Sequence, residues 1–190
     1  MVYTKKIDPD VLIEIAYDLL ENEGIEAVSM RRIAQMLDVR ASSLYHHFAD
    51  KTALLSAVAD KGLVQLAEVL EQTRLQASSD PQHQIRAMGI AYREWALQHA
   101  RLYLLLFGGA PIEEHPSPIS MAVAAPMLTT VAHMVGEQHA IAATQTAWAF
   151  VHGFVMLELA DQMRRGVPAE GFLFGLEVLV SGLSGKHSDV

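Results

Sequence analysis

A short polar cluster in the first third of the chain carries side chains that can read DNA. Hydroxyl, phenol and imidazole groups gather within six residues, at Ser42, Ser43, Tyr45, His46 and His47. Arg31, Arg40 and Lys51 flank them. Such groups hydrogen-bond to base edges in the major groove, and cations bind the phosphates. The same residues also fit the solvated face of an ordinary helix pair, so this pattern alone leaves both interpretations open.

A helix-turn-helix is the element that would position these side chains. Ser29 is a good N-cap for a first helix, a break follows at residues 38–40, and a second helix is predicted over residues 41–47. The inward positions carry apolar side chains at spacings of three and four: Ile33, Ala34, Leu37, Ala41, Leu44 and Phe48. The second helix is therefore apolar inside and polar outside, as a recognition helix must be.

Residues 24–55, which read GIEAVSMRRIAQMLDVRASSLYHHFADKTALL, resemble the DNA-binding domain of the TetR family. The shared features are the Arg-Ile-Ala run, Ser-Leu-Tyr-x-His-Phe and Lys-x-x-Leu-Leu. The resemblance implies base or phosphate contacts by Arg31, Arg40, Ser42, Ser43, Tyr45, His47 and Lys51, with His46 at a position that often touches DNA. Asp38 replaces the usual turn glycine; aspartate tolerates a left-handed backbone, so we expect the turn to survive.

Helical periodicity runs through the whole chain, so we predict an all-α protein of about nine helices. The expected domains are a three-helix DNA-binding domain, residues 1–51, and a helical bundle for ligand binding and dimerisation, residues 52–190. A long helix over residues 51–76 connects them, with Asp50 as its N-cap. Asp8 is the expected cap of the first helix, which Gly24 ends. The later helices are expected at about 82–98, 101–107, 118–136, 140–165 and 169–184.

The C-terminal half resembles a TetR ligand domain through Trp95-Ala-Leu-Gln-His-Ala-Arg-Leu-Tyr and Trp148-Ala-Phe-Val-His152-Gly153. We expect an apolar effector cavity in this half, with these candidate lining residues: Tyr92, Trp95, Leu104, Phe107, Met127, Trp148 and His152. Helices 140–165 and 169–184 carry few charges, and an apolar helix must be buried on all sides. They are the expected two-fold interface of a homodimer.

Charge and composition limit the function classes. The chain has 190 residues and a net charge of −8, whereas residues 29–51 carry four basic and two acidic side chains. There is no cysteine, no secretory signal and no motif of a hydrolase, kinase or zinc protease, which favours a cytoplasmic protein that is not an enzyme. We expect no cofactor, no metal and no membrane span. His133 and Glu137 could share a helix face, but no third ligand is evident.

These features predict a transcriptional repressor that binds a palindromic operator as a homodimer and is released by a small apolar effector. Two alternatives remain from the sequence. One is a regulator of the same fold that needs no effector. The other is a helical small-molecule-binding protein without operator binding.

Overall fold

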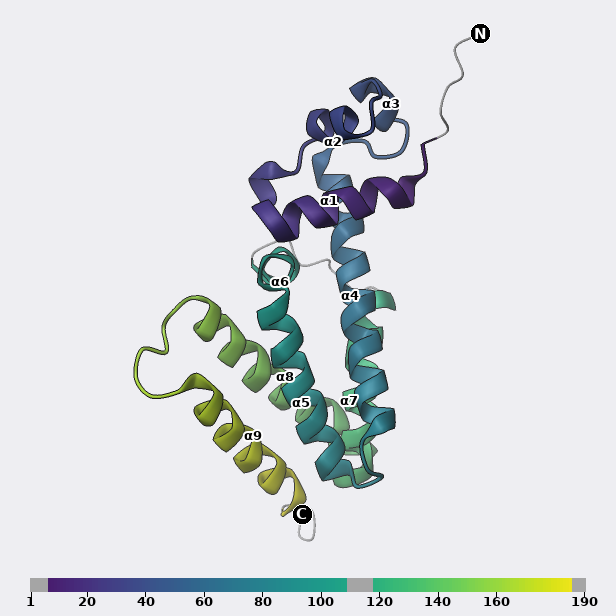
Figure 1. Ribbon diagram of the computed structural model, residues 1–190. Helices are drawn as coiled ribbons and strands as arrows, with labels where there is room; N and C mark the ends of the chain where they lie inside the picture. The colour runs from purple at the N-terminus through teal and green to yellow at the C-terminus, as the bar shows by residue number, and fades with distance from the viewer. Residues whose placement is uncertain (1–6, 109–117, 186–190) are drawn as a thin grey trace. The chain divides into compact units, whose positions relative to one another are not determined.

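A computed structural model describes residues 7–108 and 118–185, and every regular element in them is helical (Figure 1). A 3-10 turn, η1 (Ile25–Ala27), accompanies nine α-helices. The helices are α1 (Pro9–Glu23), α2 (Met30–Met36), α3 (Ala41–Leu44), α4 (Lys51–Gln76), α5 (Pro81–Gln98), α6 (Ala100–Phe107), α7 (Pro118–Val135), α8 (Glu137–Leu159) and α9 (Pro168–Ser184). The predicted all-α class and the number of helices are confirmed for these residues.

Side-chain caps begin three of these helices at the residues that the sequence predicts. The carboxylate of Asp8 accepts from the Asp10 N–H at 3.1 Å, and the hydroxyl of Ser29 accepts from Arg32 N–H at 3.2 Å. The carboxylate of Asp50 accepts from Ala53 N–H at 2.8 Å. Each bond satisfies a first-turn N–H that has no partner inside its own helix.

Aspartates end two helices in the left-handed conformation that usually selects glycine. After α2, Asp38 has φ +54°, and Val39 N–H bonds back to the Ala34 carbonyl at 3.0 Å. After α8, Asp161 has φ +53°, and Gln162 N–H bonds to the Leu157 carbonyl at 2.9 Å. Both patterns are Schellman motifs. The helix predicted over residues 140–165 therefore ends at Leu159, six residues early, and it begins at Glu137.

The helix predicted over residues 41–47 is also shorter than expected. It ends at Leu44, and Tyr45 to His47 form a tight turn in which His47 N–H bonds to the Leu44 carbonyl at 2.9 Å. Such i→i+3 bonds commonly close the last turn of a helix. The polar residues that follow α3 thus lie on a turn and not on a regular helix.

The chain contacts define two compact units, of which the first holds residues 1–62 and 99–111. Its buried side chains come from α1 to α4, from α6 and from Val28 between η1 and α2: Leu12, Ala16, Leu20, Val28, Ile33, Leu44, Leu54, Val58, Leu102 and Tyr103. Glu21 of α1 holds α6 through two groups: its carboxylate accepts from Leu102 N–H at 2.9 Å and lies 3.1 Å from His99 Nδ1. The predicted boundary after residue 51 stays a prediction; the contacts join α6 to the first unit.

The second unit holds residues 63–98 and 112–190, and its described core lies among α5, α7, α8 and α9. Its fully buried residues include Ile85, Met88, Val131, Val155 and Phe172. Two bidentate ion pairs join α5 to the last helices: Arg93 with Glu158 at 2.8 and 2.6 Å, and Arg86 with Glu177 at 2.6 and 2.7 Å. The hydrogen bonds to Arg86 lower the pKa of Glu177, and they raise the pKa of Arg86.

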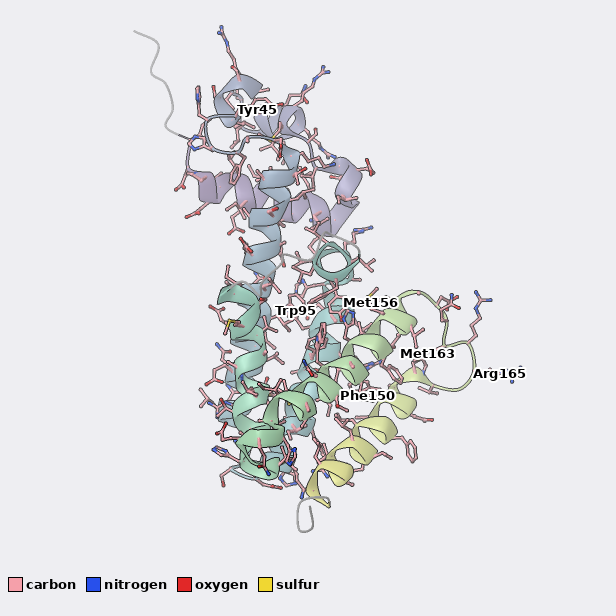
Figure 2. The ribbon with its side chains drawn as sticks, turned by 180° about the vertical axis from the view of Figure 1, so that it is seen from behind. Tyr45, Trp95, Phe150, Met156, Met163 and Arg165 are labelled. Atoms are coloured by element: carbon pink, nitrogen blue, oxygen red, sulfur yellow. The ribbon has the colours of Figure 1, made fainter. Side chains whose placement is uncertain are left out.

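An aromatic cluster packs α8 against α9, which run side by side (Figure 1). The ring of Phe150, labelled in Figure 2, stacks on Phe172 at 5.6 Å between centroids, and Phe154 meets Phe172 edge-on at 5.3 Å. Gly175 makes room for this stack, because a Cβ there would lie 2.6 Å from the ring of Phe150.

The outer faces of the same two helices are apolar and open. α8 is long and apolar enough to cross a membrane by length and composition alone, and only 28% of its most apolar window is buried within the chain. Ile141, Trp148 and Leu157 of α8, with Phe174 and Val178 of α9, are all exposed. Large exposed apolar patches are uncommon on monomeric proteins.

Replacing Gly175 by alanine should loosen the pairing of α8 with α9. Overpacking of this kind costs about 1–3 kcal/mol of unfolding free energy. Gly153→Ala is the matched control, because a Cβ on Gly153 of α8 meets nothing within 4 Å. Urea denaturation of both variants measures the difference. Equal stability of the two variants would contradict this packing.

Candidate nucleic-acid interface

α2 and α3 form the predicted helix-turn-helix, with their apolar sides turned to the core of the first unit. Met30, Ile33 and Ala34 are the buried residues of α2, and Leu44 is the buried residue of α3. The left-handed backbone of Asp38 makes the turn between the two helices, as its position predicts. Packing of these buried residues therefore fixes which sides of α2 and α3 face outward.

Six of the eight residues predicted to contact DNA are exposed on this motif. They are Arg31, Arg40, Ser42, Tyr45, His46 and His47. Tyr45 exposes 53% of its surface, and Figure 2 shows it at the outer side of the motif. Tyr45 therefore lies at the surface and not in the core. Ser43 is half-buried, and its N–H bonds to the Arg40 carbonyl at 2.9 Å.

Lys51 lies at the N-terminal turn of α4, half-buried, and donates from Nζ to the Ile25 carbonyl at 2.8 Å. An ammonium has three donors, so two can still meet a phosphate. The backbone N–H groups of Lys51 and Thr52 precede those that Asp50 caps, and a helix N-terminus favours anions. Thr52 is exposed beside Lys51 and is a further candidate that the sequence prediction did not include; its place in the first turn after Asp50 was the available signal.

Arg32 differs from its neighbour Arg31, because an ion pair engages it. Its guanidinium makes two bonds to the Glu23 carboxylate, at 2.9 and 2.7 Å, and so ties α2 to the end of α1. These bonds lower the pKa of Glu23, and they raise the pKa of Arg32. The cationic side chains of the motif that can face a phosphate are therefore Arg31, Arg40 and Lys51.

The residues predicted to bind an effector are spread over both units. Tyr92 and Trp95 are buried on α5, and Met127 and His152 are half-buried on α7 and α8. Burial lowers the pKa of His152. Leu104 and Phe107 belong to α6 in the first unit, where Leu104 is 45% exposed and the Phe107 ring packs on Tyr103 at 4.8 Å. Trp148 is half-exposed and stacks on His152 at 5.2 Å.

Two surface pockets are present in the second unit, and none of these seven residues lines either of them. The effector site stays a prediction. His133 and Glu137 do not share a helix, since Gly136, with φ +76°, separates α7 from α8. Within residues 7–108 and 118–185 no group of three metal-ligating side chains occurs.

Sequence families match both halves of the chain. Residues 12–58 match a family described as bacterial regulatory proteins, tetR family, and residues 85–177 match one described as tetracyclin repressor-like, C-terminal domain. The tetracycline repressor protein class A from transposon 1721 of Escherichia coli is 38% identical over 60 residues. That stretch is 32% of this chain and only 28% of the repressor.

Solved structures are similar over nearly the whole chain. A protein of unknown function from Rhodococcus sp. RHA1 superposes with a TM-score of 0.79 at 26% identity, covering 97% of this chain and 99% of that one. BioQ, solved with its natural double-stranded DNA operator, gives a TM-score of 0.69 at 27% identity, with 94% and 99% covered.

Substitutions of Asp38, in the turn between α2 and α3, change the free energy of unfolding and can be tested without DNA. Asp38→Ala should lower the free energy of unfolding by about 1 kcal/mol, because a left-handed backbone costs most L-residues about 1–2 kcal/mol. Asp38→Gly should be close to neutral, since glycine fits the turn but gains freedom in the unfolded chain. Chemical denaturation measures both variants. If alanine is tolerated as well as glycine, residue 38 does not need its positive φ.

Proposed function

The chain belongs to the TetR family of bacterial regulatory proteins, and on that premise we propose that it is a transcriptional regulator that binds a palindromic operator as a homodimer. The observation that carries the proposal is the exposure of Arg31, Arg40, Ser42 and Tyr45 on the helix-turn-helix and its adjoining turn, while the inner sides of α2 and α3 are buried. The operator complex of BioQ supports it, because that chain is similar over nearly its full length. The site of action would then be the cytoplasm.

Each recognition surface is small, which is why the proposal includes two copies. Three cations on a chain of net charge −8 offer few phosphate contacts, and nonspecific affinity depends on their number. A two-fold dimer doubles these contacts and reads two half-sites, about 34–36 Å apart when they are one turn of DNA apart. An operator with two-fold symmetry follows from the symmetry of such a dimer.

The apolar outer faces of α8 and α9 support the dimer contact. Phe174 is 74% exposed, although phenylalanine normally lies inside a protein. Val178 lies one turn further along α9, and Ile141 and Trp148 are exposed on α8. A second copy of the same surface would remove these side chains from water, as in interfaces whose centre is apolar.

The second unit is the place where we propose that an effector acts. Two buried polar atoms there, Gln65 Oε1 and Thr144 Oγ1, have no hydrogen-bond partner among the described residues. Such atoms are costly unless a ligand or water bonds to them. A ligand that fits one setting of the helices better shifts the population toward it. A repressor would release its operator when that setting no longer keeps the recognition helices at the half-site spacing.

Fluorescence anisotropy with DNA sequences selected from a random pool tests operator binding. Arg31→Ala and Arg40→Ala should each weaken binding and, where the lost contact is to a phosphate, reduce the salt slope by about 1. Tyr45→Ala should lower specific affinity by about tenfold, because base contacts contribute about 1–3 kcal/mol. Its exposure predicts an unchanged melting temperature.

Arg164→Ala is the control for charge. Arg164 is an exposed arginine on the segment between α8 and α9, outside the helix-turn-helix. Its loss should leave both affinity and salt slope unchanged. An equal loss for Arg164→Ala and Arg31→Ala would show binding to DNA in general and contradict the proposed recognition surface.

Phe174→Asp should produce a monomer that stays folded, because the side chain is exposed within one chain. Sedimentation velocity measures the change of mass, and operator binding should be lost with it. Leu75→Asp, at an exposed apolar position of α4, is the matched control and should stay dimeric. A variant Phe174→Asp that sediments like the unmodified protein would exclude α9 from the interface.

A further inference from the structure

An open groove of about 560 Å³ lies between α4 and α7 on the second unit. Its volume falls within the range of about 300–1,000 Å³ that is usual for small-molecule sites. Small apolar side chains form much of its wall: Ala67 on α4, and Ala122 and Ala125 on α7. The groove therefore accepts an apolar body without a large side chain in the way.

The three charged residues that line the groove, Glu68, Glu71 and Arg74, sum to a net charge of −1. Glu71 and Arg74 bond to each other twice, Nε to Oε2 at 2.8 Å and Nη2 to Oε1 at 2.6 Å. Arg74 lowers the pKa of Glu71 by these bonds, so both groups stay charged and offset one another. Glu68 is exposed one turn earlier on α4, and its carboxylate has no ion pair among the described residues.

Pro126 leaves the Ala122 carbonyl, on the opposite wall, without its α-helical donor. Proline has no N–H, so the α-helical bond to the Ala122 carbonyl, four residues earlier, cannot form. Both residues line the groove. The Pro126 carbonyl, in contrast, accepts from the Thr130 hydroxyl at 2.9 Å. The groove thus offers acceptors on both walls, whereas its guanidinium is already engaged.

We propose that this groove binds an apolar molecule that carries a protonated amine. The ammonium would meet the Glu68 carboxylate and donate an N–H to the Ala122 carbonyl, with its apolar part on the three alanines. An anion would be repelled by Glu68, and the charge of Arg74 is already offset by its two bonds to Glu71. The proposal is independent of operator binding, because it concerns the protein without DNA.

Three probes of nearly equal size test the charge preference on the full-length protein. They are 4-phenylbutylamine, the neutral 4-phenylbutanol and the anion 4-phenylbutyrate, titrated at neutral pH and followed by NMR chemical shifts. The amine should bind roughly threefold more tightly than the alcohol, since an exposed ion pair is screened by water. The butyrate should bind most weakly.

Variants then identify the site. Glu68→Gln should remove the preference for the amine and leave affinity for the alcohol unchanged, whereas Glu94→Gln, an exposed acid on α5 outside the groove, should change neither. Ala125→Phe should fill the groove and weaken all three probes. Equal binding of amine and alcohol, a preference for butyrate, or full binding by a folded Ala125→Phe would each overturn the proposal.

Discussion

Leu44 is the buried side chain of α3, and the recognition surface depends on it. A helix of four residues has no stability of its own, because nucleation of so short a helix is unfavourable. Burial of Leu44 in the core of the first unit, together with the contacts between α2 and α3, holds the motif in one conformation. Arg40, Ser42 and Tyr45 can then be exposed without losing their positions. Apolar and polar residues alternate along this part of the chain. The apolar residues pack inward and hold the motif rigid, and the polar residues face outward.

Local signals explain why much of this motif could be predicted from the sequence. A cap needs only a side-chain oxygen and an N–H two or three residues later, so Asp8, Ser29 and Asp50 were readable without knowledge of the fold. The left-handed turn at Asp38 could also be predicted, because it depends on the residue type at one position. Asp161 makes the same turn but was missed, because the apolar pattern continues to Met163 and a glycine follows at residue 166. Periodicity alone does not mark the last turn of a helix.

Long-range partners could not be predicted in this way. Glu21 serves as an N-terminal cap for α6, 81 residues later, through the Leu102 N–H. Gly62 of α4 leaves room for Leu102, whose side chain would lie 2.9 Å from an added Cβ. Nothing in the sequence near residues 101–107 shows these contacts, so α6 was expected in the bundle. The effector candidates Leu104 and Phe107 were chosen on that expectation; they belong to the first unit, whereas Tyr92 and Trp95 belong to the second.

The grouping of α6 with α1 places two helices that are distant in sequence in the first unit. Among the described residues the chain passes between the units twice, within α4 after Gly62 and between Gln98 and His99. Both crossings lead to Leu102: Gly62 approaches its side chain, and Glu21 binds its N–H next to His99. Leu102 therefore lies near both points at which the described chain leaves the first unit. Within the first unit, the ion pair of Glu23 with Arg32 joins α1 in turn to α2, so α6, α1 and α2 are connected by side-chain contacts.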